Sequence, residues 1–242
     1  MKSGDKSAII IGGTSGIGRA LTELFIDSGF QVGVTGRRQE LLEELQQKHG
    51  EKVFCRQMDV SRPEEAAETL MKLVEEMIEV DLIVISAGTG FPNPELNWEP
   101  EAETIATNVT GFAAIAVQSM KYFLQRGQGH LVSLSSIAAF RGSHEAPSYN
   151  ASKAFVSNYI EGLRVKAARS GKPIYVTDIL PGFVDTRMAQ GEGLFWVASP
   201  EKAARQIFTA IRARRRRAFV TRRWRLIALL LQILPDFIYE KI

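Results

Sequence analysis

A glycine-rich turn near the start of the chain constrains the fold more than any other feature. The apolar segment 7–12 is typical of a buried strand, and 16–28 has the pattern of an amphipathic helix. Between them, the spacing Gly-x-x-x-Gly-x-Gly lets backbone N–H groups approach a pyrophosphate at the positive end of the helix dipole. Glycine-rich turns also close ordinary strand–helix junctions, and most dinucleotide folds use Gly-x-Gly-x-x-Gly instead. The residues predicted to bind phosphate are Gly12, Thr14, Ser15, Gly16, Ile17 and Gly18.

Apolar runs rich in valine and isoleucine alternate with segments of helical period along the chain. This alternation predicts βαβ units, and hence an α/β fold with one Rossmann-type, doubly wound, parallel seven-stranded sheet and helices on both faces. Strands are expected at 7–12, 31–35, 52–57, 81–86, 129–135, 174–180 and 218–221, and helices at 16–28, 38–49, 63–78, 101–126 and 149–170. No break in composition divides the 242 residues. We therefore expect a single dinucleotide-binding and catalytic domain over 1–242, with a basic and apolar helix at 222–242 as an extension of it.

Three polar residues in the second half of the chain have a spacing that suits acid–base chemistry. Ser136, Tyr149 and Lys153 are separated by thirteen and then four residues. On a helix that begins at Tyr149, Lys153 lies one turn later on the same face, where its ammonium would lower the tyrosine pKa from about 10. Tyr149 could then exchange a proton with a substrate oxygen that Ser136 holds in place. Alone, Tyr-x-x-x-Lys is also common on solvated helix faces that do no chemistry.

Together with the glycine turn, these residues make the chain similar to the short-chain dehydrogenase/reductases over nearly its whole length. The matching segments are 11–18, Asp59 with Val60, 85–88, 108–111, Ser136 with Tyr149 and Lys153, and 181–186. The chain departs from the family at Ile11, where relatives have a threonine, and at Ile85 and Ser86, where they have two asparagines. In relatives that threonine hydroxyl ties the glycine turn to the fourth strand. The departures therefore put the local stiffness of the turn in doubt, and the chemistry less so.

The resemblance implies the sheet order 3-2-1-4-5-6-7 and hydride transfer between a nicotinamide and a carbonyl or secondary alcohol carbon. It implies that Tyr149 is the general acid and base, that Ser136 hydrogen-bonds the reacting oxygen, and that Lys153 holds the nicotinamide ribose. Asn108 would hold a water in a proton path, although it could instead satisfy a buried backbone group. The further cofactor contacts implied by the resemblance are Asp59, Val60, Ser86, Ala87, Gly88, Asn108, Tyr149, Lys153, Pro181, Gly182, Val184 and Thr186.

The end of the second predicted strand indicates which dinucleotide is bound. An NAD site usually places a carboxylate there for the ribose 2′-hydroxyl, whereas this chain has Gly36 followed by Arg37 and Arg38. Guanidinium groups match phosphate geometry, so the sequence predicts NADP, with Arg37 on the 2′-phosphate and Arg38 beside the adenine. Either arginine could instead be a solvated residue at a helix start.

Segment 187–199 is expected to form a lid over the substrate, because it follows the last family motif. Its aromatic residues Phe195 and Trp196 suggest an apolar carbonyl or alcohol substrate, but core packing would use the same residues. A rival hypothesis is a catalytically silent NADP-binding sensor or scaffold protein. The presence of Asn108, Ser136, Tyr149 and Lys153 together favours an enzyme over that hypothesis.

Charge and cysteine content limit the compartment and the partners. The single cysteine, Cys55, cannot form an internal disulfide, and the N-terminal residues lead directly into the first predicted strand, so we expect a cytoplasmic protein. The three histidines lack metal-ligand spacing, and no metal site is predicted. Nucleic acid binding is not expected, because no recognition motif accompanies the arginines. A homodimer or homotetramer through the helices at 101–126 and 149–170 is implied by the resemblance.

Basic residues outnumber acidic ones ten to one between Glu201 and Arg225. The apolar segment 226–234 follows this cluster and is too short to span a bilayer. It could lie in the interface of an anionic membrane, which would make the protein a peripheral membrane protein. It could also pack over the substrate pocket or a neighbouring subunit, and we favour this second interpretation because apolar stretches of this length are more often buried in protein.

Overall fold

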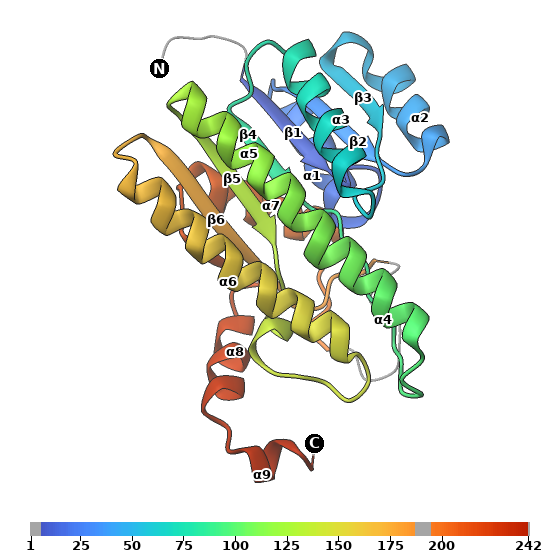
Figure 1. The fold of residues 1–242 in the computed structure, drawn as a ribbon, viewed down its shortest axis with the longest axis vertical. Coiled ribbons are helices and arrows are strands. Elements are labelled where there is room, and N and C mark those ends of the chain that lie inside the picture. Colours follow the sequence, from blue (N-terminus) through green and yellow to red (C-terminus); the bar gives the residue numbers. More distant parts are fainter. Residues whose placement is uncertain (1–5, 187–194, 242) are drawn as a thin grey trace.

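Seven parallel strands form the centre of the molecule in this computed structural model, which describes residues 6–186 and 195–241 (Figure 1). The strands are β1 (Ser7–Ile11), β2 (Gln31–Gly36), β3 (Val53–Gln57), β4 (Leu82–Ile85), β5 (Gly129–Leu134), β6 (Ile174–Pro181) and β7 (Arg217–Val220). Their order is β3-β2-β1-β4-β5-β6-β7, and every pairing is parallel. The fold class and the sheet order expected from the sequence are therefore confirmed.

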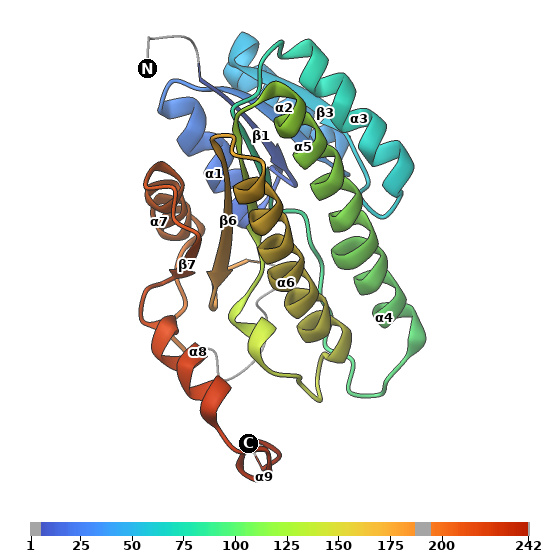
Figure 2. The same ribbon diagram turned by 60° about the vertical axis from the view of Figure 1, so that its left-hand side comes forward.

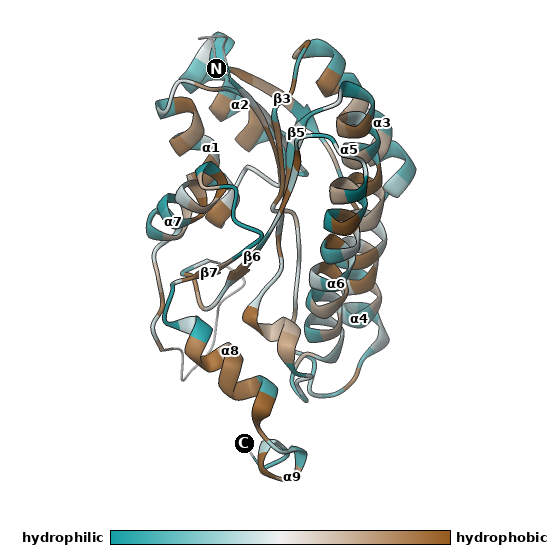
Figure 3. Ribbon diagram, turned by 90° about the vertical axis from the view of Figure 1, so that its left-hand side faces the viewer, coloured by the Kyte–Doolittle hydropathy of each residue, from teal (hydrophilic) through white to brown (hydrophobic). Residues whose placement is uncertain are grey.

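Two layers of helices cover the two faces of the sheet, as Figures 2 and 3 show. Helices α3 (Pro63–Glu76), α5 (Phe112–Arg126) and α6 (Pro147–Arg169) pack on one face, and α1 (Gly16–Asp27), α2 (Gln39–His49) and α7 (Pro200–Arg212) on the other. Along β1, Ile9 and Ile11 face the first layer while Ala8 and Ile10 face the second. Both sides of the strand are buried, which explains its uninterrupted apolar sequence.

Three helical segments differ from the sequence prediction. The helix expected over 101–126 is α4 (Trp98–Ile105), a π-helical turn (Ala106–Gly111) and α5 in succession. Helix α6 begins at Pro147, two residues before Tyr149. Helix α7 had no counterpart in the prediction, although a parallel connection from β6 to β7 requires a crossover. It begins with the Ser199 hydroxyl accepting a hydrogen bond from the Lys202 N–H, at 3.2 Å.

The C-terminal segment projects away from the sheet as α8 (Trp224–Ile233) and α9 (Asp236–Tyr239) (Figures 1 and 2). Helix α8 packs against β7 and the short 3-10 helix η3 (Ile137–Phe140). It buries Trp224 and Ala228 but leaves Leu226, Leu229, Leu230 and Ile233 exposed. We expected from the sequence that this helix packs on protein. Within one chain, only one side of the helix does so. Across the described parts of the chain, no helix has both the length and the apolarity that a membrane span needs.

Candidate functional site

The glycine turn after β1 lies against the end of β4 and is fixed there by backbone contacts. Gly12 has φ +82°, and a Cβ at this position would lie 2.7 Å from the Cα of Ala87, so only glycine fits. The Ile11 carbonyl accepts hydrogen bonds from the N–H groups of Ser86 and Ala87, at 2.9 and 2.8 Å. These bonds tie the turn to the fourth strand although the family's threonine is replaced by Ile11, whose side chain is fully buried.

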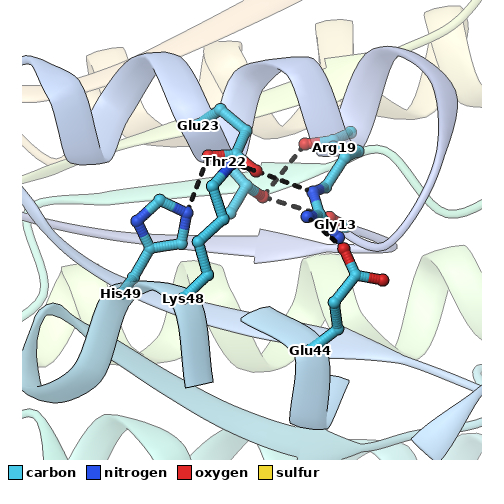
Figure 4. Close-up of polar contacts among 8 residues, drawn as sticks. Gly13, Arg19, Thr22, Glu23, Glu44, Lys48 and His49 are labelled. Atoms are coloured by element: carbon cyan, nitrogen blue, oxygen red, sulfur yellow. Dashed lines mark hydrogen bonds and ion pairs between the residues drawn. The ribbon is translucent and has the colours of Figure 1, made fainter. Parts of the chain in front are cut away.

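A side chain on the first helix also holds the turn, as Figure 4 shows. The buried Thr22 hydroxyl lies within hydrogen-bonding distance of the carbonyls of Gly13, at 3.2 Å, and Gly18, at 3.0 Å. Glycine is also required at Gly18, because a Cβ there would lie 2.1 Å from the Gly12 carbonyl oxygen. Thr22 was not among the predicted site residues. No motif marks it, and its partners are backbone atoms that only the folded turn brings to it.

Ion pairs join α1 to α2 beside the glycine turn (Figure 4). The Glu23 carboxylate lies 2.9 Å from Arg19, 3.0 Å from Lys48 and 2.7 Å from the His49 ring nitrogen Nε2. Burial acts to raise the pKa of Glu23, but the hydrogen bonds from Lys48 and Arg19 and the nearby charges outweigh it, and the pKa is lowered. The network fixes the helix whose N-terminus faces the predicted phosphate site.

The two arginines after β2 have different surroundings. The Arg37 side chain is 62% exposed, and its nearest charged partner is Glu103, at 3.9 Å. Arg38 precedes α2 and reaches back toward the glycine turn, where its Nη2 lies 3.5 Å from the Thr14 hydroxyl. A Cβ at Gly36 would lie 2.7 Å from the Thr14 side chain, so the absence of a side chain at Gly36 allows this approach.

The other predicted adenine-side residues follow β3. The Asp59 carboxylate accepts hydrogen bonds from the Ser61 N–H and hydroxyl, at 3.0 and 2.8 Å, just before α3 begins. Val60 is buried, and its carbonyl oxygen would lie 2.1 Å from a Cβ at Gly111. The π-helical turn therefore packs so closely against the backbone of Val60, after β3, that only glycine fits at position 111.

Ser136 and Tyr149 meet at the carboxyl end of β5. The Ser136 hydroxyl accepts a hydrogen bond from the Ala138 N–H, at 3.1 Å, and lies 3.4 Å from the Pro181 carbonyl. Burial raises the pKa of Tyr149 above its usual value, and the hydrogen bond with Ser136 lowers it by less. The ring of Tyr149 is covered by Gly90, where a Cβ would lie 2.4 Å from the tyrosine Cδ2. Gly90 was not predicted as a site residue, because its role is to leave space.

Lys153 lies beside the tyrosine, but its effect differs from the prediction. Its ammonium donates a hydrogen bond to the Leu134 carbonyl, at 3.1 Å, and lies 5.6 Å from the centroid of the Tyr149 ring. Burial lowers the pKa of Lys153 to about 8, although the charge of Asp178 acts to raise it. The predicted lowering of the Tyr149 pKa by Lys153 is wrong for this structure, because burial of the phenol dominates.

Asn108 occupies the π-helical turn between α4 and α5. Its side-chain Oδ1 accepts from the Thr89 N–H at 2.8 Å, and its Nδ2 donates to the Thr89 carbonyl at 2.6 Å and to the Ser152 hydroxyl at 3.0 Å. The amide therefore satisfies partly buried backbone groups of Thr89, and the water-holding role stays a prediction. π-Helical turns interrupt α-helices mostly at functional sites, and here the turn lies between the end of β4 and α6.

A buried carboxylate beneath the site carries no motif that could have revealed it. Asp178 in β6 has no exposed surface, and its oxygens accept hydrogen bonds from Ser135 and Ser157, both at 2.6 Å. Arg217 lies 3.9 Å away. Burial raises the pKa of Asp178, and the serine hydrogen bonds and Arg217 act against this. Ser135 directly precedes Ser136, and Ser157 lies one turn after Lys153 on α6. Asp178 therefore connects the segment that carries Ser136 to the helix that carries Lys153.

The segment after β6 links the site to the C-terminal helix. A Cβ at Gly182 would lie 2.2 Å from Trp224, which is buried, and Phe183 packs edge to face on the same ring at 5.2 Å. Val184 is buried and forms a β-bridge to Ala198. Thr186 lies close to the glycine turn, with its Cγ2 3.0 Å from a Cβ placed on Gly16. Of the predicted lid 187–199, residues 187–194 lie outside the described residues.

Comparison with known proteins identifies the family. The family model described as short chain dehydrogenase matches residues 6–194. The chain belongs to the short-chain dehydrogenases. An uncharacterized oxidoreductase of Myxococcus xanthus is 37% identical, with 76% of this chain and 74% of that protein covered. The NADP-dependent 3-hydroxy acid dehydrogenase YdfG of Escherichia coli is 31% identical, with 73% and 71% covered.

Solved structures with this fold include two proteins that hold a dinucleotide. Serine dehydrogenase complexed with NADP⁺ has a TM-score of 0.77 and 27% identity, with 85% of this chain and 88% of that chain covered. A variant of actinorhodin polyketide ketoreductase with NADPH has a TM-score of 0.77 and 26% identity, with 89% and 95% covered. The predicted family and oxidoreductase class are confirmed. The roles of the individual site residues stay predictions.

The short-chain dehydrogenase motifs converge on one edge of the sheet. Gly12 and Ser86 follow β1 and β4 directly, Ser136 comes two residues after the end of β5, and Pro181 ends β6. Open α/β sheets bind ligands outside the carboxyl ends of their strands. Among the residues that the structure describes, there is no cluster of three or more histidine, cysteine or acidic side chains able to hold a metal ion.

Proposed function

We propose that this short-chain dehydrogenase is an NADP(H)-dependent oxidoreductase that interconverts a carbonyl and a secondary alcohol, with Tyr149 as the general acid and base. The observation that carries the proposal is that Ser136 is near enough to Tyr149 to act on its pKa, and that Lys153, one helical turn further along α6, has its ammonium 5.6 Å from the centroid of the tyrosine ring. The three side chains lie at the strand edge that the glycine turn also reaches. This arrangement places the predicted proton donor, Tyr149, at the edge of the sheet where a dinucleotide would bind.

The residues at the glycine turn fit a dinucleotide phosphate. Helix α1 begins at Gly16 with no acidic residue in its first turn, so its N–H groups and the positive end of its dipole can face an anion. Gly12 and Gly18 leave room where a Cβ would collide with backbone. Arg37 and Arg38 follow β2 in place of the carboxylate that would repel a 2′-phosphate. NADP agrees with the cofactors of the relatives, and the bound dinucleotide would supply or accept the hydride.

The residues of this chain then handle the proton and the oxygen. In the reductive direction Tyr149 donates its phenolic proton to the oxygen of the substrate. Ser136 hydrogen-bonds the same oxygen and keeps it within reach of the tyrosine. Lys153 is placed to contact the ribose of the dinucleotide as well as the tyrosine, because its ammonium approaches Gly88 at the end of β4. Asn108 holds the Thr89 backbone and, through Ser152, the start of α6.

We propose an apolar substrate, because aromatic side chains gather beside the segment that follows β6. Phe183, Phe195, Trp196 and Trp224 contact one another with ring centroids 5.1 to 5.9 Å apart. The cluster begins at Phe183, directly after Gly182. The carbonyl of Pro181, which precedes Gly182, lies 3.4 Å from the Ser136 hydroxyl. A 3-hydroxy acid, as in the name of the Escherichia coli relative, is the second candidate.

Pairing of two copies through α4, α5 and α6 is also proposed. Ile105 and Val165 are exposed apolar side chains on these helices. The stripe on α6 that includes Phe155, Tyr159 and Leu163 is only partly buried against the core of its own chain. Both observations leave apolar surface for a second copy, and short-chain dehydrogenases are commonly oligomers.

The decisive experiment is a screen of the purified protein with NADPH against a panel of apolar ketones and 3-oxo acids, read as loss of nicotinamide absorbance. Tyr149→Phe should lower the rate about 10²- to 10⁴-fold, since it removes the proton donor, while the affinity for NADPH stays within about twofold. Tyr175→Phe, near the start of β6 and at the opposite end of that strand from Pro181, is the matched control and should keep full activity. NADPH binding with no turnover of any carbonyl would instead favour the catalytically silent sensor or scaffold.

A further inference from the structure

Helix α8 is apolar on two opposite sides, and only one of them is covered. Trp224 and Ala228, one turn apart, are buried against the body of the protein. On the opposite side four residues follow the i, i+3, i+4, i+7 spacing of a single helix face. This apolar stripe consists of Leu226, Leu229, Leu230 and Ile233, with 50 to 69% of each residue exposed.

Exposed apolar residues also occur beyond α8. Phe237 on α9 is 65% exposed, and α8 and α9 together project from the end of the molecule (Figures 1 and 3). Exposed apolar residues that occur singly are normal on a soluble protein, but a continuous stripe on a projecting helix marks an interaction surface.

Arginines flank the apolar stripe at the start of α8. Arg222, Arg223 and Arg225 are exposed, and the segment 221–235 contains no acidic residue. The next carboxylate, Asp236, is 2.9 Å from Arg141 and is therefore already paired. The surface beside the stripe is thus strongly positive and suits an anionic partner.

A basic hollow of about 300 Å³ lies next to these arginines. It is lined by Lys202, Gln206, Thr221, Arg222 and Arg223. The Thr221 side chain is buried, and its hydroxyl has no hydrogen-bond partner among the residues that the structure describes. A hydroxyl donor surrounded by three cationic side chains matches the chemistry of a phosphate group.

We propose that α8 and α9 bind the surface of an anionic phospholipid membrane. The apolar stripe and Phe237 would enter the boundary between headgroups and acyl chains, and the basic hollow would hold a lipid phosphate. With ten residues, α8 is far too short to span a bilayer, which needs about twenty, so it lies in the interface.

The charges favour a membrane over a second copy of the chain. Two copies that paired through the apolar stripe would present the same patch to each other. Each would bring Arg222, Arg223 and Arg225, but neither α8 nor α9 carries a cluster of carboxylates to meet them. A surface of anionic lipid supplies negative charge and apolar contact together.

Flotation with vesicles tests the proposal with no need for a substrate. The full chain should float at low salt with phosphatidylcholine vesicles that contain phosphatidylserine, should bind pure phosphatidylcholine vesicles more weakly, and should be released by high salt. Leu229→Ser with Ile233→Ser should abolish flotation. Arg222→Ala with Arg225→Ala should weaken binding to the anionic vesicles roughly thirtyfold, since each basic side chain at such a surface contributes about fivefold.

Matched controls separate this surface from general charge and hydrophobicity. Arg215→Ala with Arg216→Ala removes the same charge just before β7, at the opposite end of that strand from Thr221, and should bind like the wild type. Ile78→Ser with Leu96→Ser removes exposed apolar side chains elsewhere and should also bind like the wild type. A wild-type protein that stays in the dense fraction with both vesicle types would overturn the proposal. So would light scattering in which Leu229→Ser with Ile233→Ser halves the mass of a species that does not float, because a second copy would then cover the stripe.

Discussion

At Tyr149, burial and hydrogen bonding act on the phenol in opposite directions. Burial raises its pKa, and the hydrogen bond with Ser136 reduces that effect without reversing it. The phenol is therefore protonated at neutral pH, as a group that donates a proton to a carbonyl oxygen must be. Lys153, whose pKa burial lowers to about 8, can give up its own proton more easily than an exposed lysine can.

Arg37 is expected to set the preference for NADPH over NADH. Its pair with Glu103 is long and exposed, so breaking it to bind a phosphate costs little. A charge-assisted hydrogen bond is worth about 1.5 to 3 kcal/mol. Arg37→Ala should therefore weaken NADPH binding roughly ten- to a hundredfold and leave NADH binding almost unchanged, as measured by titration calorimetry.

The control for this prediction is Arg62→Ala, which removes an equally exposed arginine that follows β3. It should change the affinity for neither dinucleotide. Equal affinity of the wild-type protein for NADPH and NADH would contradict the assignment of Arg37.

Site residues differ in how far the sequence can reveal them. Ser136, Tyr149 and Lys153 could be proposed as site residues because their residue types and their order along the chain match a known pattern. Thr22, Gly90 and Asp178 are not predictable in this way. Asp178 acquires its partners only when β5 pairs with β6 and α6 packs over them, and each partner is an ordinary serine in its own segment.

Among the secondary-structure elements, α7 is a helix whose signal is present in the sequence but was overlooked. Its exposed side is polar and mostly basic, and its buried side has apolar residues at helical spacing, namely Ala203, Ala204, Ile207, Ala210 and Ile211. The strands are predictable to within two residues, and the central strands β1 and β4 are the clearest, because burial on both faces makes them nearly continuously apolar. The π-helical turn at Asn108 escapes prediction since it changes the hydrogen-bond register and not the residue pattern.

The contact between Gly182 and Trp224 joins two elements that are far apart in the sequence. Gly182→Ala would place a Cβ 2.2 Å from the indole, and the close packing forces α8 to shift. We expect a loss of about 1 to 3 kcal/mol in the free energy of unfolding. We also expect a lower kcat, because Pro181 next to it lies against Ser136. Urea denaturation and steady-state kinetics measure the two effects.

A double variant tests whether the collision is the cause. Trp224→Ala added to Gly182→Ala removes the obstacle, so the two changes should together cost less than the sum of their separate effects. Gly142→Ala, where a Cβ meets no atom within 4 Å, is the control and should be nearly neutral. Additive losses in the double variant would show that Gly182 and Trp224 act independently.

For the molecule as a whole, stability in acid depends on a histidine buried in the sheet. His130 in β5 is 8% exposed, and its Nε2 lies 2.8 Å from the Thr177 hydroxyl. Burial, assisted by the charge of Arg214, lowers the pKa of His130 to about 4, against about 6.5 in the unfolded chain. Because the unfolded chain binds this proton first, the contribution of His130 is fully present above pH 6.5 and is lost as the pH falls toward 4.

The loss of stability caused by His130 can be measured by comparison with a variant that has no titratable group at position 130. Between pH 7 and pH 4.5 the free energy of unfolding of the wild type should fall by about 2 kcal/mol more than that of His130→Gln, measured by urea denaturation. The acidic residues and the other histidines are the same in both proteins, so their effects cancel in the comparison. His144→Gln, in an exposed loop, should follow the wild type. If the wild type and His130→Gln lose stability in parallel, the ring is hydrated and charged in the folded protein, and the packing of β5 between β4 and β6 does not exclude water as the structure implies.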